Sequence, residues 1–180
     1  GQGSADQVLT SDGTDIAWAD AGGGVSGLTG LVENNSIWLG DDPSGTTDTA
    51  SYSVALGTTA LDAITTGDSN SAIGYDALTA NTTGASNVAV GKSALAANTT
   101  GTQNVAIGAT ALDAATTVNN NVAIGFDALT ASTIGDNVAV GTSAMAANTT
   151  GTYNVAVGKS AMAADTTGAN NTAVGAFALD

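Results

Sequence analysis

Apolar and polar residues alternate in short runs along most of the chain, and nearly the same run keeps returning. The stretch NVAVGKSALAANTTGTQ, residues 87–103, shows the unit: a Val-Ala-Val run, a glycine, an apolar Ala-Leu pair and a polar Asn-Thr-Thr-Gly segment. Period-two alternation with β-branched residues predicts a short strand, and the glycine and Asn-Thr-Thr-Gly segments predict turns. The pattern therefore predicts one short β-strand in each repeat.

The glycine that closes each strand measures the repeat. It occupies positions 40, 57, 74, 91, 108, 125, 141, 158 and 175, so the spacing is 17 residues throughout, apart from one interval of 16. A short fixed period is typical of a solenoid, whose coils bury their apolar residues by stacking on one another. Helical solenoid repeats are about twice as long. We therefore expect an all-β, parallel β-solenoid rising about 4.8 Å per coil, with no helix at 93–97 despite the helix-forming composition of SALAA.

Side-chain alternation gives each predicted strand two faces. We expect the larger residues that flank the central alanine, such as Val88 and Val90, to point into the coil. A third interior row follows four residues after the glycine: Leu61, Leu78, Leu95, Leu112, Leu129, Met145, Met162 and Leu179.

On this interpretation the central alanines face outward. Three buried aliphatic side chains contribute roughly 1.5 to 3 kcal/mol each, whereas ordering one residue costs about 1 to 2 kcal/mol, so a single stack is marginal. Solvent does not require alanine, but the close approach of another chain does, and we predict a homotrimer interface there. Recent copying of the coils is the alternative reason for such uniform rows. The predicted interface residues are Ala55, Ala72, Ala89, Ala106, Ala123, Ala139, Ala156 and Ala173.

Asparagines and glycines recur at the predicted turns. The asparagines at 70, 87, 104, 121, 137, 154 and 171 predict a hydrogen-bonded ladder at one corner. The glycines at 67, 84, 101, 135, 151 and 168 are expected to supply positive φ angles. Val118 interrupts that series, so its turn is expected to differ. In the 16-residue coil, the missing residue is expected in the turn after Gly135.

Composition and charge exclude several classes of function. The chain has 16 acids, only Lys92 and Lys159 as cations, and neither histidine nor cysteine. The net charge of -14 disfavours nucleic acid and anionic membranes. The acids recur only in alternate or more distant coils, too far apart for a catalytic pair. We therefore expect no enzyme activity, no cofactor, no metal site and no membrane insertion.

The repeat resembles known trimeric fibres. The element N-V-A-V-G-x-x-A is similar to the head repeats of trimeric autotransporter adhesins, and the longer unit resembles tandem repeats of bacteriophage tail fibres. This resemblance covers residues 36–180 and implies a left-handed β-roll assembled as a homotrimer. It also implies partner fibre or tail proteins at its ends, contact with a host surface glycan or protein, and a place on the virion. A bacterial cell-surface adhesin is the alternative.

The first residues follow another pattern. The segment ADQVLTSDGTDIAWADAGGG, residues 5–24, resembles modules of phage tail-fibre shafts, in which a strand pair near a tryptophan precedes a Gly-rich joint. We expect three parts: this module in residues 1–24, a connecting segment with a degenerate capping coil in 25–52, and the regular solenoid in 53–180. Trp38 takes the alanine position of the degenerate coil and is interpreted as its end cap; a ligand-binding aromatic is the alternative.

Two candidate binding surfaces remain. The outward positions after the strand-closing glycine have diverged, and Tyr75 and Phe126, with Lys92 and Lys159 beside them, are candidates for receptor contact. Solvated variation is the alternative. A threonine row resembles ice-binding solenoid faces, although Thr-Thr before glycine is ordinary turn chemistry. Its members are Thr65, Thr82, Thr99, Thr116, Thr133, Thr149 and Thr166.

Overall fold

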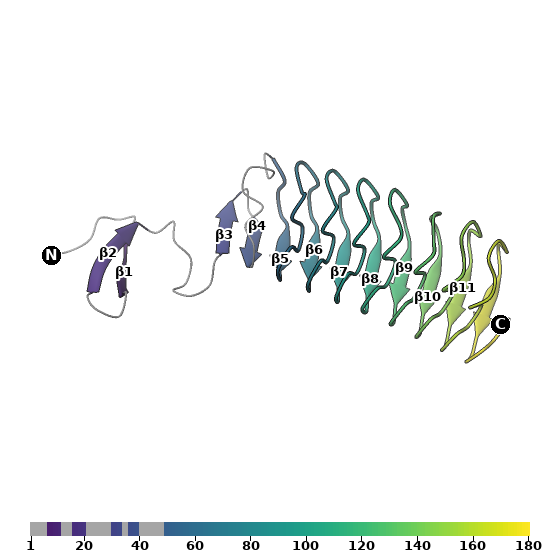
Figure 1. The fold of residues 1–180 in the computed structure, drawn as a ribbon. Coiled ribbons are helices and arrows are strands. Elements are labelled where there is room, and N and C mark those ends of the chain that lie inside the picture. The colour runs from purple at the N-terminus through teal and green to yellow at the C-terminus, as the bar shows by residue number, and fades with distance from the viewer. Residues whose placement is uncertain (1–6, 12–15, 21–29, 34–35, 40–48) are drawn as a thin grey trace.

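The structure is a computed structural model that describes residues 7–11, 16–20, 30–33, 36–39 and 49–180. These residues form twelve β-strands, and none of them is helical (Figure 1). The predicted all-β class is therefore confirmed for this part of the chain.

Two antiparallel strand pairs precede the regular repeat. Strand β1 (Gln7–Ser11) pairs with β2 (Ile16–Asp20), and Leu9 lies opposite Trp18. This is the strand pair near a tryptophan that the resemblance implies. Strand β3 (Gly30–Glu33) pairs antiparallel with β4 (Ser36–Leu39), which in turn pairs parallel with the first regular strand. The β3–β4 pair therefore closes one edge of the long parallel sheet.

Eight three-residue strands stack in parallel, one from each coil (Figure 1). Identical repeat positions face one another across every junction, so that Ala89, for example, pairs with Ala106. This confirms the parallel β-solenoid and a strand at the Val-Ala-Val run of every regular coil. The strands are β5 (Val54–Leu56), β6 (Ser71–Ile73), β7 (Val88–Val90), β8 (Val105–Ile107), β9 (Val122–Ile124), β10 (Val138–Val140), β11 (Val155–Val157) and β12 (Thr172–Val174).

Left-handed residues turn each coil back on itself. In one coil they are Gly91 with φ 131°, Ser93 with 56°, Leu95 with 52° and Gln103 with 60°. The residues of the SALAA segment consequently form turns, as expected. Positive φ is adopted by the strand-closing glycines and not by the turn glycines that we expected to adopt it.

The turn glycines are needed for another reason. A Cβ added to Gly84 would lie 2.4 Å from the carbonyl oxygen of Gly101 in the next coil and 2.3 Å from Oδ1 of Asn81. Stacked backbones leave no room for a side chain there. The requirement for glycine therefore comes from close packing inside the solenoid, and the prediction of positive φ was wrong.

The predicted orientation of the strands was also wrong. The central alanines, the proposed interface row, point into the coil: Ala106 is 0% exposed, whereas Ile107 is 38% exposed. The Val and Ile residues that flank the alanines, including Val88 and Val90, lie on the outside. The leucine row is interior as predicted, from Leu61 to Met162, except that Leu179 in the last described coil is exposed.

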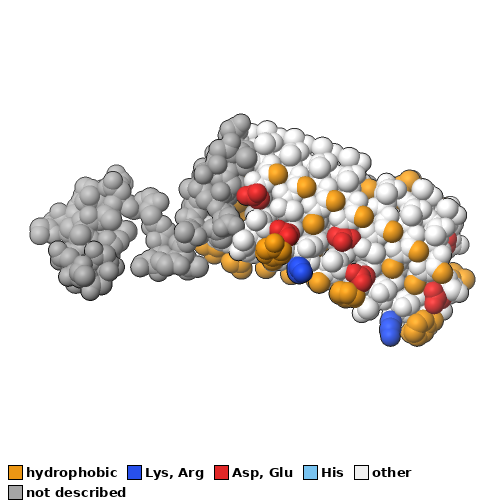
Figure 2. All heavy atoms as spheres, viewed as in Figure 1, with side chains coloured by type: hydrophobic (Ala, Val, Ile, Leu, Met, Phe, Trp, Pro, Cys, Tyr) orange, Lys and Arg blue, Asp and Glu red, His pale blue; other side chains and the backbone are white. Residues whose placement is uncertain are grey.

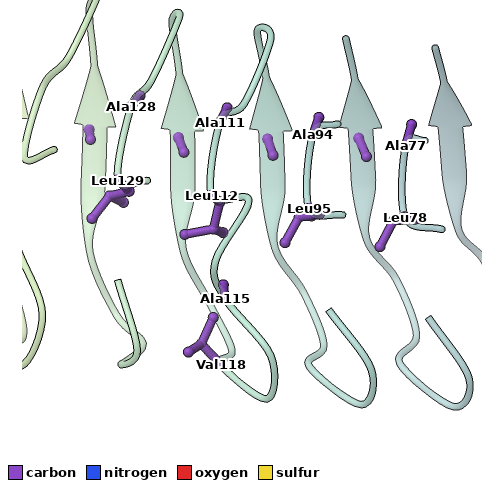
Figure 3. Close-up of a cluster of buried hydrophobic side chains, with 14 of the residues drawn as sticks. Ala77, Leu78, Ala94, Leu95, Ala111, Leu112, Ala115, Val118, Ala128 and Leu129 are labelled. Atoms are coloured by element: carbon purple, nitrogen blue, oxygen red, sulfur yellow. The ribbon is translucent and has the colours of Figure 1, made fainter. Parts of the chain in front are cut away.

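The narrow cross-section of the coil explains this inversion. Figure 3 shows successive Ala-Leu pairs, such as Ala94 and Leu95, projecting into the space behind the strands. One leucine per coil reaches across this space, so the strand opposite can contribute only a methyl group. Larger side chains on the strand would overpack the interior.

An asparagine column runs along one corner, as predicted. Each of the asparagines at 70, 87, 104, 121, 137 and 154 uses Oδ1 to accept a bond from the backbone N–H of the next, at 2.9 to 3.0 Å. Their Nδ2 atoms donate to turn carbonyls of the following coil at 2.6 to 3.0 Å. Ser53 and Ser36 extend the column toward β4. Every buried amide of the column is thereby hydrogen-bonded.

A second buried polar column, which the repeat pattern did not predict, contains Asn81 and Asn98. Asn98 donates to Oδ1 of Asn81 at 2.8 Å, and both amides donate to turn carbonyls. In the next coil Ala115 replaces the asparagine, and Oδ1 of Asn98 has no protein hydrogen-bond partner. The column is thus interrupted where Val118 replaces the turn glycine (Figure 3).

The irregular turns fall in the same place. The carbonyl of Val118 accepts a 2.7 Å hydrogen bond from Nδ2 of Asn104, as the carbonyls of the turn glycines accept one from the equivalent asparagines. The backbone of this turn therefore keeps its hydrogen bond. The difference that we expected at Val118 is found in the interior, where Ala115 replaces the asparagine. In the short coil the corresponding acceptor is the carbonyl of Ile134, to which Nδ2 of Asn121 donates at 3.0 Å. The missing residue therefore falls in the threonine pair before Ile134. The prediction of a turn was right, but the position after Gly135 was wrong.

Candidate functional site

The outer face of the parallel sheet carries mainly apolar side chains. Two side-chain columns cover it, one from the first and one from the third residue of each strand. Leu56, Ile73 and Ile107 are 45%, 40% and 38% exposed. Parallel sheets are normally covered on both faces, whereas here the coil covers only the inner one. The residues of the two columns are half-buried or exposed: Val54, Ser71, Val88, Val105, Val122, Val138, Val155 and Thr172, and Leu56, Ile73, Val90, Ile107, Ile124, Val140, Val157 and Val174.

This sheet face is regular and uncharged. Its strands pair without register shift, so equivalent side chains follow one another from coil to coil. Neither column contains an acid or a base, although the chain carries a net charge of -14. Contiguous apolar patches of this kind are typical of protein interaction sites. Sequence alternation pointed to these residues, but we assigned them to the interior.

The alanine row cannot provide the interface predicted from sequence. Ala55, Ala72, Ala89, Ala106, Ala123, Ala139, Ala156 and Ala173 are all buried within a single chain, at 3% exposure or less. Another chain cannot contact them without unfolding the coil. The alanines are uniform because the interior of every coil has the same small volume.

The candidate receptor-contact residues occupy one edge of the sheet. Tyr75, Lys92, Phe126 and Lys159 each follow a strand-closing glycine and are exposed, with both rings at 53%. Nζ of Lys159 lies 5.6 Å from the ring centroid of Phe177, which belongs to the next coil. Figure 2 shows large hydrophobic side chains and lysines along one long edge, beside a broad face of small side chains and scattered acids. The predicted residues therefore share one edge.

Trp38 occupies the position predicted from the degenerate coil. It lies opposite Ala55 in the sheet register and is 1% exposed. Its ring belongs to the same buried cluster as the alanines and leucines. A buried position at the first parallel strand fits an end cap, and a ring so enclosed offers no surface to a ligand.

The threonine row is engaged in the turns. The hydroxyl of Thr65 donates to the carbonyl of Thr82 at 2.9 Å, and Thr82 donates to Thr99 at 3.0 Å. Thr99, Thr133 and Thr149 make the equivalent bond to the following coil. These hydroxyl hydrogens are therefore used within the protein, and the row stabilises the stacking of turns.

The acids of the described residues are spread over the coils. No group of three or more His, Cys, Asp or Glu side chains in the described ranges could hold a metal ion. Several acids instead accept bonds from threonines of adjacent coils: Asp76 from Thr59, Asp127 from Thr110, and Asp113 from Thr130 at 2.5 Å. These carboxylates link successive coils.

The described residues contain no helix long and apolar enough to cross a membrane. Two parts of the solenoid surface carry exposed large apolar side chains: the outer sheet face, and the edge that bears Tyr75 and Phe126. No family model, curated protein or solved structure gave a significant match to the chain.

Proposed function

We propose that this chain forms a rigid homotrimeric shaft or head of a bacteriophage tail fibre that takes part in host attachment. The observation that carries the proposal is the apolar sheet face on a regular stack of similar coils. A structural and adhesive role requires no catalytic activity and no cofactor, and the proposal assigns none.

The occupants of the sheet face are two further copies of the same chain. Exposed Val, Leu and Ile side chains lose contact with water when buried, which stabilises an assembly by roughly 25 cal/mol per Å² of apolar area. A self-complementary face without charges suits identical partners, because no charge pair has to be matched. Three such faces meeting around one axis bury the face on every subunit equally and leave none open.

The stack itself supports the role of a rigid spacer. The junctions repeat the same backbone pairing, and from Asn70 to Asn171 the same asparagine bonds, so these coils are fixed on their neighbours. The resemblance to tail-fibre repeats and to their N-terminal modules favours a phage origin, and the β1–β2 pair with Trp18 fits such a module. Its partners would be fibre or tail proteins at the two ends and a glycan or protein on the host surface.

A bacterial trimeric surface adhesin is the second candidate, because the N-V-A-V-G-x-x-A element is also similar to the head repeats of that class. Ice binding is a distant third, which the hydrogen-bonded threonine hydroxyls disfavour. Absence of thermal hysteresis in a solution of the protein would remove it.

Two measurements test the proposal. Sedimentation equilibrium should give three times the 17.1 kDa chain mass; a monomer at micromolar concentration contradicts the trimer. Antibodies raised against the chain should label fibres on phage particles released by the source culture in immunogold electron microscopy. Labelling of bacterial surfaces without particles would identify the adhesin instead.

A further inference from the structure

We infer that the aromatic edge of the solenoid binds a neutral, extended, β-linked polysaccharide lying parallel to the fibre axis. The inference rests on the proposed attachment function, because it names the class of surface molecule that the shaft itself would contact. We define the aromatic edge as Tyr75, Lys92, Phe126, Lys159 and Phe177.

The rings are evenly spaced along this edge. Tyr75 and Phe126 immediately follow the glycines at 74 and 125, and Phe177 lies two residues after Gly175, so each ring is three coils from the next. With one coil rising about 4.8 Å, successive rings are roughly 14 Å apart. Tyr75 and Phe126 are each 53% exposed, and Phe177, in the last described coil, is 57% exposed. The structure thus presents three platforms at successive heights along the stack, with Tyr75 and Phe126 in one row and Phe177 one residue beside it.

Flat rings spaced along the stack match the apolar faces of sugar rings. The C–H groups on one face of a pyranose carry partial positive charge and pack against the negative face of an aromatic ring. An extended β-linked chain presents such faces at regular intervals along a straight path. A polymer that coils tightly would meet one platform and miss the next.

Polar groups for sugar hydroxyls accompany the rings. Asp76 and Asp127 directly follow two of the rings, and each carboxylate is held by a threonine of the preceding coil. Lys92 and Lys159 are exposed, and Lys159 packs over the ring of Phe177. Acceptors and donors therefore lie beside the platforms.

The net negative charge of the chain favours a neutral polymer over an anionic one. Two lysines stand against a net charge of -14, so a polyanion would be repelled over the length of the fibre. A neutral polysaccharide carries no such penalty. Weak contacts at three platforms add by multivalency, so a polymer should bind far more tightly than a single sugar.

Affinity electrophoresis of the 180-residue protein tests this inference. Native gels contain hydroxyethylcellulose, glycol chitin or mixed-linkage β-glucan, with polygalacturonate as the anionic comparison. We expect at least one neutral polymer to retard the protein, and polygalacturonate to leave its mobility unchanged. The triple variant Tyr75→Ala, Phe126→Ala, Phe177→Ala should lose apparent affinity by about 10²-fold or more, since three linked contacts disappear together.

The chain offers a matched control. Tyr52 and Tyr153 are equally exposed, at 66% and 63%, but precede the strands and lie outside the aromatic edge. The double variant Tyr52→Ala, Tyr153→Ala should bind like the parent. Circular dichroism should give both variants the parent melting temperature, because every substituted ring is exposed. No retardation by any neutral polymer, retardation by polygalacturonate alone, or equal loss in the control variant overturns the inference. Immunogold labelling of virions would then still support the fibre, so the two failures are distinguishable.

Discussion

The backbone N–H of Asn104 donates a 3.0 Å hydrogen bond to Oδ1 of Asn87, its counterpart one coil earlier. Nδ2 of Asn104 donates in turn to the carbonyl of Val118 in the following coil, at 2.7 Å. One side chain therefore connects three successive coils, and its Oδ1 accepts the N–H of Asn121. The column satisfies backbone groups that a corner would otherwise leave unpaired within the protein.

Replacing Asn104 with alanine should destabilise the solenoid strongly. The change leaves the carbonyl of Val118 and the N–H of Asn121 buried without these partners, at roughly 1 to 3 kcal/mol each. Urea unfolding followed by circular dichroism measures the loss. The exposed Thr100→Ala variant in a neighbouring turn should unfold like the parent. Equal stability of the two variants would show that the column is dispensable.

Leu95 should tolerate methionine but not isoleucine. Its φ is 52°, a left-handed conformation that strains β-branched side chains by about 1 to 3 kcal/mol. Met145 and Met162 already occupy the equivalent position, each with φ 53°. Leu95→Ile keeps the side-chain volume, so any loss of stability reports the strain of a β-branched residue in this backbone conformation. Leu95→Met should lower the free energy of unfolding by less than about 1.5 kcal/mol. Comparable melting temperatures for the two variants would contradict this explanation.

Ala106→Leu should disrupt the coil. Ala106 is fully buried between strand and leucine row, and a larger side chain there overpacks the interior by about 1 to 3 kcal/mol or more. Loss of β-structure at a lower temperature, measured at a concentration where the assembly is intact, is the expected result. A variant with unchanged melting temperature that only dissociates would restore the interface role originally predicted for this alanine.

Ile107→Glu should separate the chains but leave the coil folded. The side chain lies on the sheet face, 38% exposed in a single chain, so the coil accommodates glutamate, but the proposed trimer would bury three carboxylates together. We expect dissociation to monomers in sedimentation velocity, with the β-sheet circular dichroism signal retained. Thr100→Glu, on an exposed turn, is the control for added charge. A trimeric Ile107→Glu variant would place the interface elsewhere.

Ala115 and Val118 should be energetically coupled. In the preceding coil, a Cβ at Gly101 would lie 2.3 Å from Oδ1 of Asn98, so valine at this turn requires a smaller residue in the place of the asparagine. Ala115→Asn alone should clash with Val118, and Val118→Gly alone should leave a cavity. The double variant should recover stability, with a coupling energy of about 0.5 to 3 kcal/mol in a double-mutant cycle. Additive effects would show that the two changes arose independently.

Much of the fold was predictable from sequence because its period is local. The 17-residue spacing, the Val-Ala-Val strands, the leucine row and the asparagine column each follow from residues that recur at one position. The candidate receptor residues were likewise identified by position, and they do share one edge. The contribution of Phe177 was missed, because it lies one residue beyond the diverged row and joins the edge only through Lys159 in space.

The sequence by itself determined that each strand has two faces; only the tertiary structure decided which face is inside. Hydrophobicity favoured Val88 and Val90 as interior residues, but in the folded coil Ala89 and Leu95 are the buried ones. A larger side chain at position 89 would overpack the interior beside Leu95. The same crowding explains glycine at position 84, where the neighbouring carbonyl leaves no room for a Cβ. Side-chain volume across the coil is a property of two segments brought together by folding, and no pattern along one segment contains it.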